Sequence, residues 1–292
     1  MAGAMAVYRW TRRLLSLSAA AAALWLPLST AAQDGEPRKA LRVCQDPNNL
    51  PFSNLAGEGI ENRLADVFGR ALGLPVTYYS FPARMAFIRN TLRYKLPGED
   101  YRCDIVMGVP VGFDQVSVTK PLYRSTYALV YAQGRGLDGV KTVQDFLSLP
   151  ADRLKSLRIG LYDRTPASAW LVKHGLVDQG VPYLMMSPDP DQYPGQLLET
   201  ELAAGKIDVA LVWGPIAGFF AKRVQQPLLQ VLPLRSEPGV KLDFAMAMGV
   251  RHGEREWKQQ VEQLIDSRRE DIQAILREYR VPLVDDSGAL IP

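Results

Sequence analysis

The chain has 292 residues, of which 47% are hydrophobic and 22% are charged, and its formal net charge is +3. This length and composition are enough to bury one large core or two smaller ones, and the sequence contains no internal repeat or low-complexity tract. Lysine and arginine do not form a run interleaved with aromatic residues, which argues against nucleic acid or an anionic membrane surface as a partner.

The first 32 residues have the order of charge and hydrophobicity that is typical of a signal peptide. Three arginines within the first thirteen residues precede an apolar run over residues 14–28, and Ser29-Thr30-Ala31-Ala32 follows it. The alternative is a transmembrane anchor, but a run of about 15 residues is shorter than the roughly 20 that span a bilayer. We therefore expect cleavage at residue 31 or 32, export to the periplasm, and no transmembrane anchor after cleavage.

Export changes both the charge and the chemistry of the cysteines. Removing residues 1–32 takes away three arginines and no Lys, Asp or Glu, so the remaining 260 residues have no formal net charge. The oxidising periplasm allows Cys44 and Cys103 to form a disulfide, and the alternative is two buried free thiols. Cys44 ends one predicted strand and Cys103 precedes another, which leaves open whether their Cα atoms lie within the ~7 Å that a bridge requires.

Short strands alternate with helices from residue 41 to residue 109. Apolar residues recur at helical spacing from Ile60 to Leu72, and Gly73 is typical of the residue that ends a helix. The predicted elements are a strand at 41–44, a loop at 45–59, a helix at 60–72, a strand at 76–81, a helix at 84–94 and a strand at 104–109. Three strands and two helices in this order predict a first α/β half-domain.

A second copy of the pattern follows a predicted strand at 127–132 and the glycine-rich stretch Gly134-Arg135-Gly136, where we expect the chain to change lobes. The predicted elements are helices at 142–147, 166–174, 196–204 and 216–224 and strands at 158–162, 183–186, 207–212 and 228–232. A return strand at 243–250 and helical spacing over 254–279 complete the chain and are expected to rejoin the first lobe.

This order of elements predicts an α/β fold, and over nearly all of the chain after residue 32 it resembles the type II periplasmic solute-binding proteins. The resemblance implies two lobes, each a mixed sheet flanked by helices, joined by two crossing strands. The expected boundaries are a signal peptide at 1–32, the first part of lobe 1 at 33–132, lobe 2 at 133–238, and the return strand and C-terminal helices of lobe 1 at 239–292.

Two segments resemble a narrower family. They are RVCQDPNNLPFSN at residues 42–54 and YRCDIVMGVP at residues 101–110, and both are similar to the MoxJ/XoxJ-like proteins associated with quinoprotein methanol dehydrogenases. The resemblance implies a periplasmic accessory protein that assists or activates a pyrroloquinoline-quinone (PQQ)-dependent methanol or alcohol dehydrogenase, of either the calcium or the lanthanide type. It implies no cofactor held by this chain itself.

A ligand or partner crevice is expected beyond the carboxyl ends of the strands, between the lobes. The residues predicted to line it are Asp46, Asn48, Asn49, Phe52, Ser53, Pro110, Gly112, Phe113, Tyr123, Arg124, Ser125, Arg164, Thr165 and Trp213. In amino-acid-binding relatives an arginine and an aspartate grip the ligand, and the corresponding places fall near Gln115 and Trp213. Desolvating two ligand charges without countercharges costs several kcal/mol, so an amino-acid ligand is not expected.

The remaining polar groups allow a neutral or singly anionic ligand, with Arg124 or Arg164 as a bidentate partner. The alternative for each arginine is a solvated or ion-paired surface residue. For Trp213 the alternatives are a packing residue that plugs the crevice and an aromatic platform for a ligand or partner.

The sequence contains no recognisable catalytic or metal-binding motif. Its two histidines, His174 and His252, have no Cys, Asp or Glu neighbours at metal-ligand spacing. We therefore expect a binding protein and not an enzyme. The hypotheses are an accessory protein of a PQQ-dependent dehydrogenase and, alternatively, the substrate-binding component of an ABC transporter for a neutral or weakly acidic solute.

Overall fold

The computed structural model describes residues 38–83, 86–185, 189 and 191–291. The strands are β1 (Leu41–Gln45), β2 (Asn48–Asn49), β3 (Ser53–Asn54), β4 (Val76–Ser80), β5 (Ile105–Pro110), β6 (Ser117–Ala132), β7 (Ile159–Tyr162), β8 (Gly180–Tyr183), β9 (Val209–Trp213), β10 (Leu229–Pro233) and β11 (Asp243–Val250). The α-helices are α1 (Ile60–Leu72), α2 (Phe87–Asn90), α3 (Val143–Leu147), α4 (Ala151–Ser156), α5 (Pro166–Lys173), α6 (Gly214–Arg223), α7 (Arg255–Ser267) and α8 (Arg269–Glu278), with a 3₁₀ turn η1 (Val177–Gln179) and a π-helix η2 (Leu197–Leu202). The predicted signal peptide lies outside the described residues.

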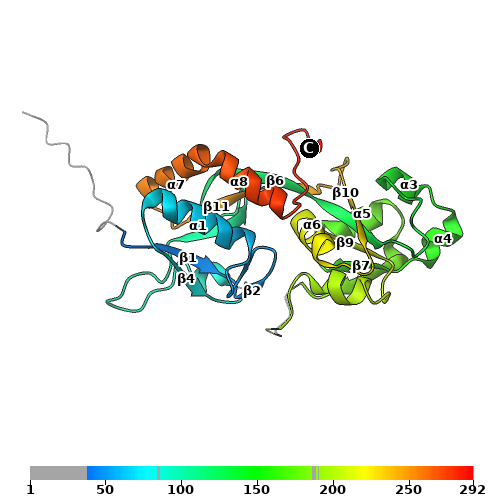
Figure 1. The fold of residues 1–292 in the computed structure, drawn as a ribbon, viewed down its shortest axis with the longest axis horizontal. Helices are drawn as coiled ribbons and strands as arrows, with labels where there is room; N and C mark the ends of the chain where they lie inside the picture. The colour runs from blue at the N-terminus through cyan, green and yellow to red at the C-terminus, as the bar shows by residue number, and fades with distance from the viewer. Residues whose placement is uncertain (1–37, 84–85, 186–188, 190, 292) are drawn as a thin grey trace, which may run out of the picture. The chain divides into compact units, whose positions relative to one another are not determined.

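One long strand, β6, belongs to two sheets (Figure 1). Its first part, up to Thr126, pairs antiparallel with β11, which continues through β5 and β1 to β4. Its second part, from Tyr127, pairs antiparallel with β9 and β10, and β9 continues in parallel through β7 to β8. The predicted type II fold with two mixed sheets is confirmed, whereas the predicted domain boundaries stay a prediction.

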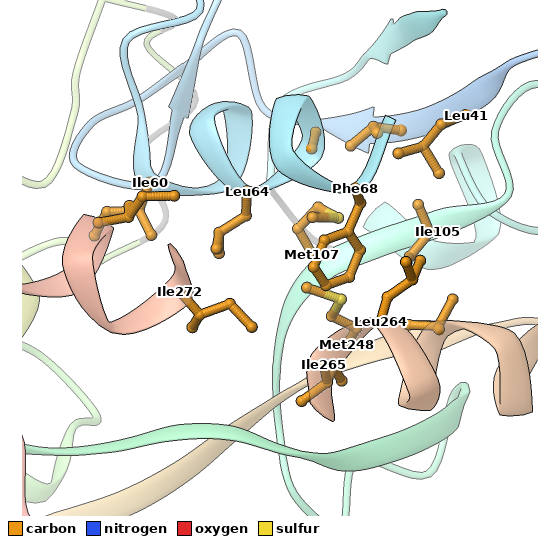
Figure 2. Close-up of a cluster of buried hydrophobic side chains, with 14 of the residues drawn as sticks. Leu41, Ile60, Leu64, Phe68, Ile105, Met107, Met248, Leu264, Ile265 and Ile272 are labelled. Atoms are coloured by element: carbon orange, nitrogen blue, oxygen red, sulfur yellow. The ribbon is translucent and has the colours of Figure 1, made fainter. Parts of the chain in front are cut away.

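The first sheet is covered by α1, α7 and α8, which share one hydrophobic core (Figure 2). Helix α1 buries Ile60, Leu64 and Phe68 at the spacing of one helical face and ends at Gly73, whose φ of 66° is the left-handed conformation that favours glycine. Figure 2 shows these side chains meeting those of the sheet and of the C-terminal helices. Helices from opposite ends of the chain thus stabilise the first lobe together.

The second sheet has a hydrophobic cluster on each face. One cluster includes Phe146 of α3 and Trp170 of α5, and the other includes Leu198 of η2 and Phe220 of α6. Residues of β6 alternate between them: Leu129 and its odd-numbered neighbours join the first cluster, and the even-numbered residues join the second. The second lobe is therefore a sheet between two helical layers.

A disulfide joins Cys44 of β1 to Cys103, with a Cα–Cα separation of 5.3 Å. The distance is short because β1 and β5 are adjacent parallel strands in which Cys44 is opposite Val106. Both cysteines are buried in a small cluster with Ile88 and Leu92. The end of one strand and the approach to the next are thus close enough to bridge, which the sequence left open.

A buried ion-pair network lies next to the disulfide. The carboxylate of Asp104 accepts two hydrogen bonds from Arg42, at 2.7 and 2.8 Å, and one from Arg251 at 2.8 Å. Arg251 also donates to the backbone oxygens of Leu92 and Cys103 and pairs with Glu254 at 2.6 Å. Arg251 therefore connects β11, the disulfide and the start of α7.

Several predicted elements differ from the structure in extent. The helix expected at 84–94 is observed only as α2, because Ala86, with φ 66°, and the bend at Thr91 limit it. The strand expected at 183–186 ends at Tyr183. The helical spacing expected over 254–279 is observed as two C-terminal helices, α7 and α8, which meet at Arg268, where φ is −116°. Helix α4 was not predicted. Within the described residues, no helix is both long and apolar enough to cross a membrane.

Candidate functional site

A cavity of about 700 Å³ lies at the carboxyl ends of strands from both sheets. Aromatic side chains form much of its lining, and they are Phe52, Tyr127, Tyr162, Tyr183, Tyr193 and Trp213. The polar residues of the lining are Asp46, Asn48, Asn49, Gln192, Gln196, Thr200 and Glu201. This size and position are those of a small-molecule site in an α/β protein.

The first-lobe wall of the cavity is the loop after β1. The carboxylate of Asp46 accepts backbone hydrogen bonds from Asn48, at 2.8 Å, and from Ala83. The hydroxyl of Ser53 donates to the backbone oxygen of Asp46 at 2.9 Å. Gly59 packs directly against the backbone of Phe52. A Cβ at this position would be 2.1 Å from the backbone oxygen of Phe52, so only glycine fits. Backbone contacts therefore fix this wall.

The second-lobe wall consists of the ends of three neighbouring strands. Tyr162, Tyr183 and Trp213 are the last residues of β7, β8 and β9, and Tyr162 is directly opposite Tyr183. Trp213 packs edge-on against Tyr127, with ring centroids 5.4 Å apart, and against Phe244 at 6.0 Å. Trp213 thus packs against both hydrophobic clusters of the second sheet and also lines the cavity.

The tyrosine hydroxyls of this wall already have partners. Tyr162 donates to the backbone oxygen of Pro194 at 2.8 Å, and Tyr183 donates to Glu201 at 3.1 Å. Burial raises the pKa of Tyr127 to about 12, although the hydrogen bond with Thr165 acts in the opposite direction, so this phenol stays neutral at physiological pH. The wall therefore presents uncharged rings.

Two carboxylates line the cavity, and no described lining residue is a lysine, arginine or histidine. A hydrogen bond from Lys206 at 2.9 Å is the main cause that lowers the pKa of Glu201, so this carboxylate is ionised. Lys206 itself is 62% exposed and is not part of the lining. The described surface of the cavity therefore carries acidic but not basic groups.

Glu61, the second residue of α1, lies close to the first-lobe wall of the cavity, and its backbone N–H donates to the backbone oxygen of Phe52 at 2.8 Å. Burial raises its pKa to about 8, and repulsion from Asp46 adds to the rise. A Cβ at Gly108 of β5 would be 2.4 Å from the Glu61 carboxylate, so the glycine provides the space for it. Among the described residues no side chain forms an ion pair with Glu61.

Only part of the predicted crevice lines the cavity. The predicted residues that line it are Asp46, Asn48, Asn49, Phe52 and Trp213. Ser53 is not in the lining, but its hydroxyl donates to the backbone oxygen of Asp46. Pro110, Gly112, Phe113 and Tyr123 are not in the lining, and Phe113 packs in the cluster around the disulfide.

The remaining predicted residues have other partners. Arg124 pairs with Asp243, and Ser125 donates to the backbone oxygen of Pro282 at 2.7 Å. Thr165 is buried and donates to the backbone of Tyr162 at 2.8 Å. The Arg164 side chain is 93% exposed and pairs with its neighbour Asp163 at 3.6 Å. Neither arginine lines the cavity, so each is observed as a surface or ion-paired residue.

Five residues of the lining were not among those predicted for the crevice: Tyr127, Tyr162, Tyr183, Tyr193 and Glu201. The available signal was an aromatic residue at the end of two predicted second-lobe strands, because Tyr162 ends the strand predicted at 158–162 and Trp213 follows the one predicted at 207–212. Because parallel strands end at one edge of a sheet, these residues would have been expected to form one wall. Tyr183 was placed at the start of the strand predicted at 183–186, whereas it is the last residue of β8, so its position at the cavity was not predicted.

The second lobe is also packed against the C-terminal part of the first. The rings of Phe219 and Tyr279 stack with centroids 5.4 Å apart, and Lys222 of α6 donates to the backbone oxygen of Glu278 at 3.0 Å. A Cβ at Gly218 would be 1.8 Å from the backbone oxygen of Arg280. Helix α6 therefore rests directly on the end of α8.

Two mixed sheets that share one long strand, with a cavity at the carboxyl ends of strands from both, define a type II solute-binding-protein fold. No family model matches the chain. The crystal structure of the periplasmic binding protein XoxJ from Methylobacterium extorquens AM1 is 35% identical, covers 85% of this chain and 100% of that chain, and has a TM-score of 0.66.

Two curated relatives agree with this match. Protein MoxJ of Paracoccus denitrificans is 28% identical over 260 residues, which are 85% of this chain and 90% of the relative. Protein MoxJ of Methylorubrum extorquens is 28% identical over 280 residues, which are 89% of this chain and 87% of the relative. The chain belongs to the MoxJ/XoxJ family of type II periplasmic binding proteins.

Proposed function

We propose that this protein is a periplasmic accessory protein that binds a PQQ-dependent methanol or alcohol dehydrogenase and assists or activates it. The observation that carries the proposal is the 35% identity to XoxJ over the whole of that chain. Export by a signal peptide at residues 1–32 is part of the proposal, and protein sequencing of the exported chain tests it. A first residue before Ser29 would contradict cleavage at the proposed site.

The contacts of the described residues support a role other than amino-acid capture. No described residue of the cavity supplies the cation that a ligand carboxylate needs, and Arg124 and Arg164 have other surroundings. Helix α6 already rests on the end of α8 through Phe219 and Tyr279. A pair of lobes held in this way is suited to present a fixed surface to a partner protein.

The test is capture of the dehydrogenase. Residues 33–292 carrying an affinity tag are incubated with a periplasmic extract of methanol-grown cells, and the bound fraction is assayed for dye-linked alcohol dehydrogenase activity. We expect this activity to be retained, and an amino-acid-binding protein of the same fold, with the same tag, to retain none. If the activity stays in the unbound fraction and the purified dehydrogenase is not activated by the protein, the accessory function is wrong.

The cavity of about 700 Å³ favours a second candidate, the substrate-binding component of an ABC transporter for a small solute. This function predicts a ligand-dependent rise in thermal stability, since a ligand at 100 times its dissociation constant stabilises the folded state by about 2.7 kcal/mol. A metabolite screen that finds such a ligand, together with failure to capture the dehydrogenase, would favour the transporter function.

A further inference from the structure

We propose that the cavity binds a small organic cation, an alkylated ammonium group with an apolar body. This inference goes beyond the accessory function and does not depend on it. It rests on three properties of the lining: the sign of its charge, its aromatic surface and the hydrogen-bonding state of its tyrosines.

The charged residues of the described lining are both acidic. Asp46 enters from the loop after β1 and Glu201 from η2, so the two carboxylates come from different lobes. The arginines that would attract an anion are placed elsewhere, with Arg124 paired to Asp243 and Arg164 exposed beside Asp163. A cation in the cavity would gain attraction from Asp46 and from Glu201, whose charge Lys206 at 2.9 Å offsets in part, whereas an anion would be repelled by both carboxylates.

The aromatic surface of the same cavity suits an alkylated ammonium. Tyr162, Tyr183 and Trp213 form one continuous wall at the ends of three adjacent strands, and all three are half-buried. The faces of tyrosine and tryptophan rings attract cations, and tryptophan does so most strongly. The same faces bury the methyl groups of the ligand.

The tyrosine hydroxyls also favour a cation over an anion. Each phenol has one hydrogen to donate, and three of these hydrogens are directed to protein acceptors: the backbone of Pro194, Glu201 and Glu199. The phenol oxygens that remain can only accept hydrogen bonds or contact a positive group. At these three rings a ligand carboxylate would therefore meet oxygens that cannot donate to it, and the side-chain donors left in the described lining are neutral, such as the amides of Asn49 and Gln192.

The test compares three molecules of similar size by calorimetry and thermal shift with residues 33–292. Choline carries the cation, 3,3-dimethylbutan-1-ol is its neutral isostere, and glycine betaine adds a carboxylate to the cation. We expect choline to bind at least tenfold more tightly than either of the others. Equal binding of the neutral isostere, tighter binding of glycine betaine, or no choline binding at millimolar concentrations would overturn the proposal.

Variants locate the binding in the cavity. Trp213→Leu and Glu201→Gln should each weaken choline binding about tenfold, whereas Arg164→Ala, outside the lining, should leave it unchanged. Circular dichroism shows which variants fold, and Glu201→Gln carries the test if Trp213→Leu does not fold. Choline binding that survives Glu201→Gln unchanged would contradict the proposed site. Dehydrogenase capture is measured separately, so the two proposals can fail independently.

Discussion

Two carboxylates of the first lobe, Asp104 and Glu61, have pKa values that are shifted in opposite directions. At Asp104, burial alone would raise the pKa, but hydrogen bonds and attraction from Arg42 and Arg251 outweigh it and hold the pKa below its usual value. At Glu61, burial raises the pKa to about 8, and the nearby charge, on Asp46, is of the same sign. Asp104, whose charge is balanced by two arginines, stabilises the first lobe. Glu61, whose charge would have no such partner among the described residues, lies beside the cavity.

The largest effect is expected when Asp104 loses one of the arginines that stabilise its charge. Arg251→Met deletes the hydrogen bonds to Asp104 and to the backbone oxygens of Leu92 and Cys103. Because it leaves a buried charge with one partner fewer, we expect the free energy of unfolding to fall by about 3–5 kcal/mol. Urea denaturation measures the change.

Asp208→Asn provides the control for that variant, because Asp208 pairs with the half-exposed Arg158 at 3.0 Å. A surface pair contributes little to stability, so a much smaller change is expected. Equal losses of unfolding free energy in the two variants would mean that the contribution of the Asp104 ion pairs to stability does not depend on their burial.

The disulfide is the covalent part of the same scaffold. Replacing both Cys44 and Cys103 by serine removes a bridge between residues 59 apart in the sequence, and we expect a loss of about 2–4 kcal/mol. The comparison is between the oxidised parent, the reduced parent and the double variant in thermal unfolding. If the reduced parent is as stable as the oxidised parent, the bridge does not contribute to the stability of this lobe.

Local patterns predicted the elements that depend on local chemistry. The return strand was predicted at Asp243–Val250, where it is observed, and Gly73 ends α1 as expected. The first half of β6 was not predicted, because Lys120, Pro121 and Arg124 interrupt any apolar pattern there. Its strand conformation comes from pairing with β11, more than a hundred residues later, which no local pattern contains.

In the candidate site, too, some residues could be predicted from local patterns and others depend on distant parts of the chain. Asp46, Phe52 and Trp213 were expected at the cavity because each follows or ends a predicted strand, and topology brings strand ends together. The surroundings of Arg124 depend on Asp243, which is 119 residues away and which no spacing rule connects to it. Strand ends can therefore be predicted from the sequence, whereas the partners of individual charges require the folded chain.

A smaller effect is expected from the pH dependence of stability that Glu61 causes. The folded-state pKa of about 8 lies above the ordinary value of 4.5, so between these values the folded state keeps a proton that the unfolded state has lost. The stability that this proton provides is fully present below pH 4.5 and is lost as the pH rises to about 8. Because the Glu61 side chain is only half-buried, we expect a loss of about 1–2 kcal/mol over this range.

Glu61→Gln should remove this slope, so that the difference in unfolding free energy between variant and parent grows from pH 5 to pH 8. Glu201→Gln is a control of opposite sign, because the pKa of Glu201 is lowered, chiefly by the hydrogen bond from Lys206. The contribution of Glu201 is present above its unfolded pKa and is lost as the pH falls through its folded pKa. Parallel stability curves for the parent and Glu61→Gln from pH 5 to pH 8 would show that Glu61 is compensated after all, and the contrast with Asp104 would fail.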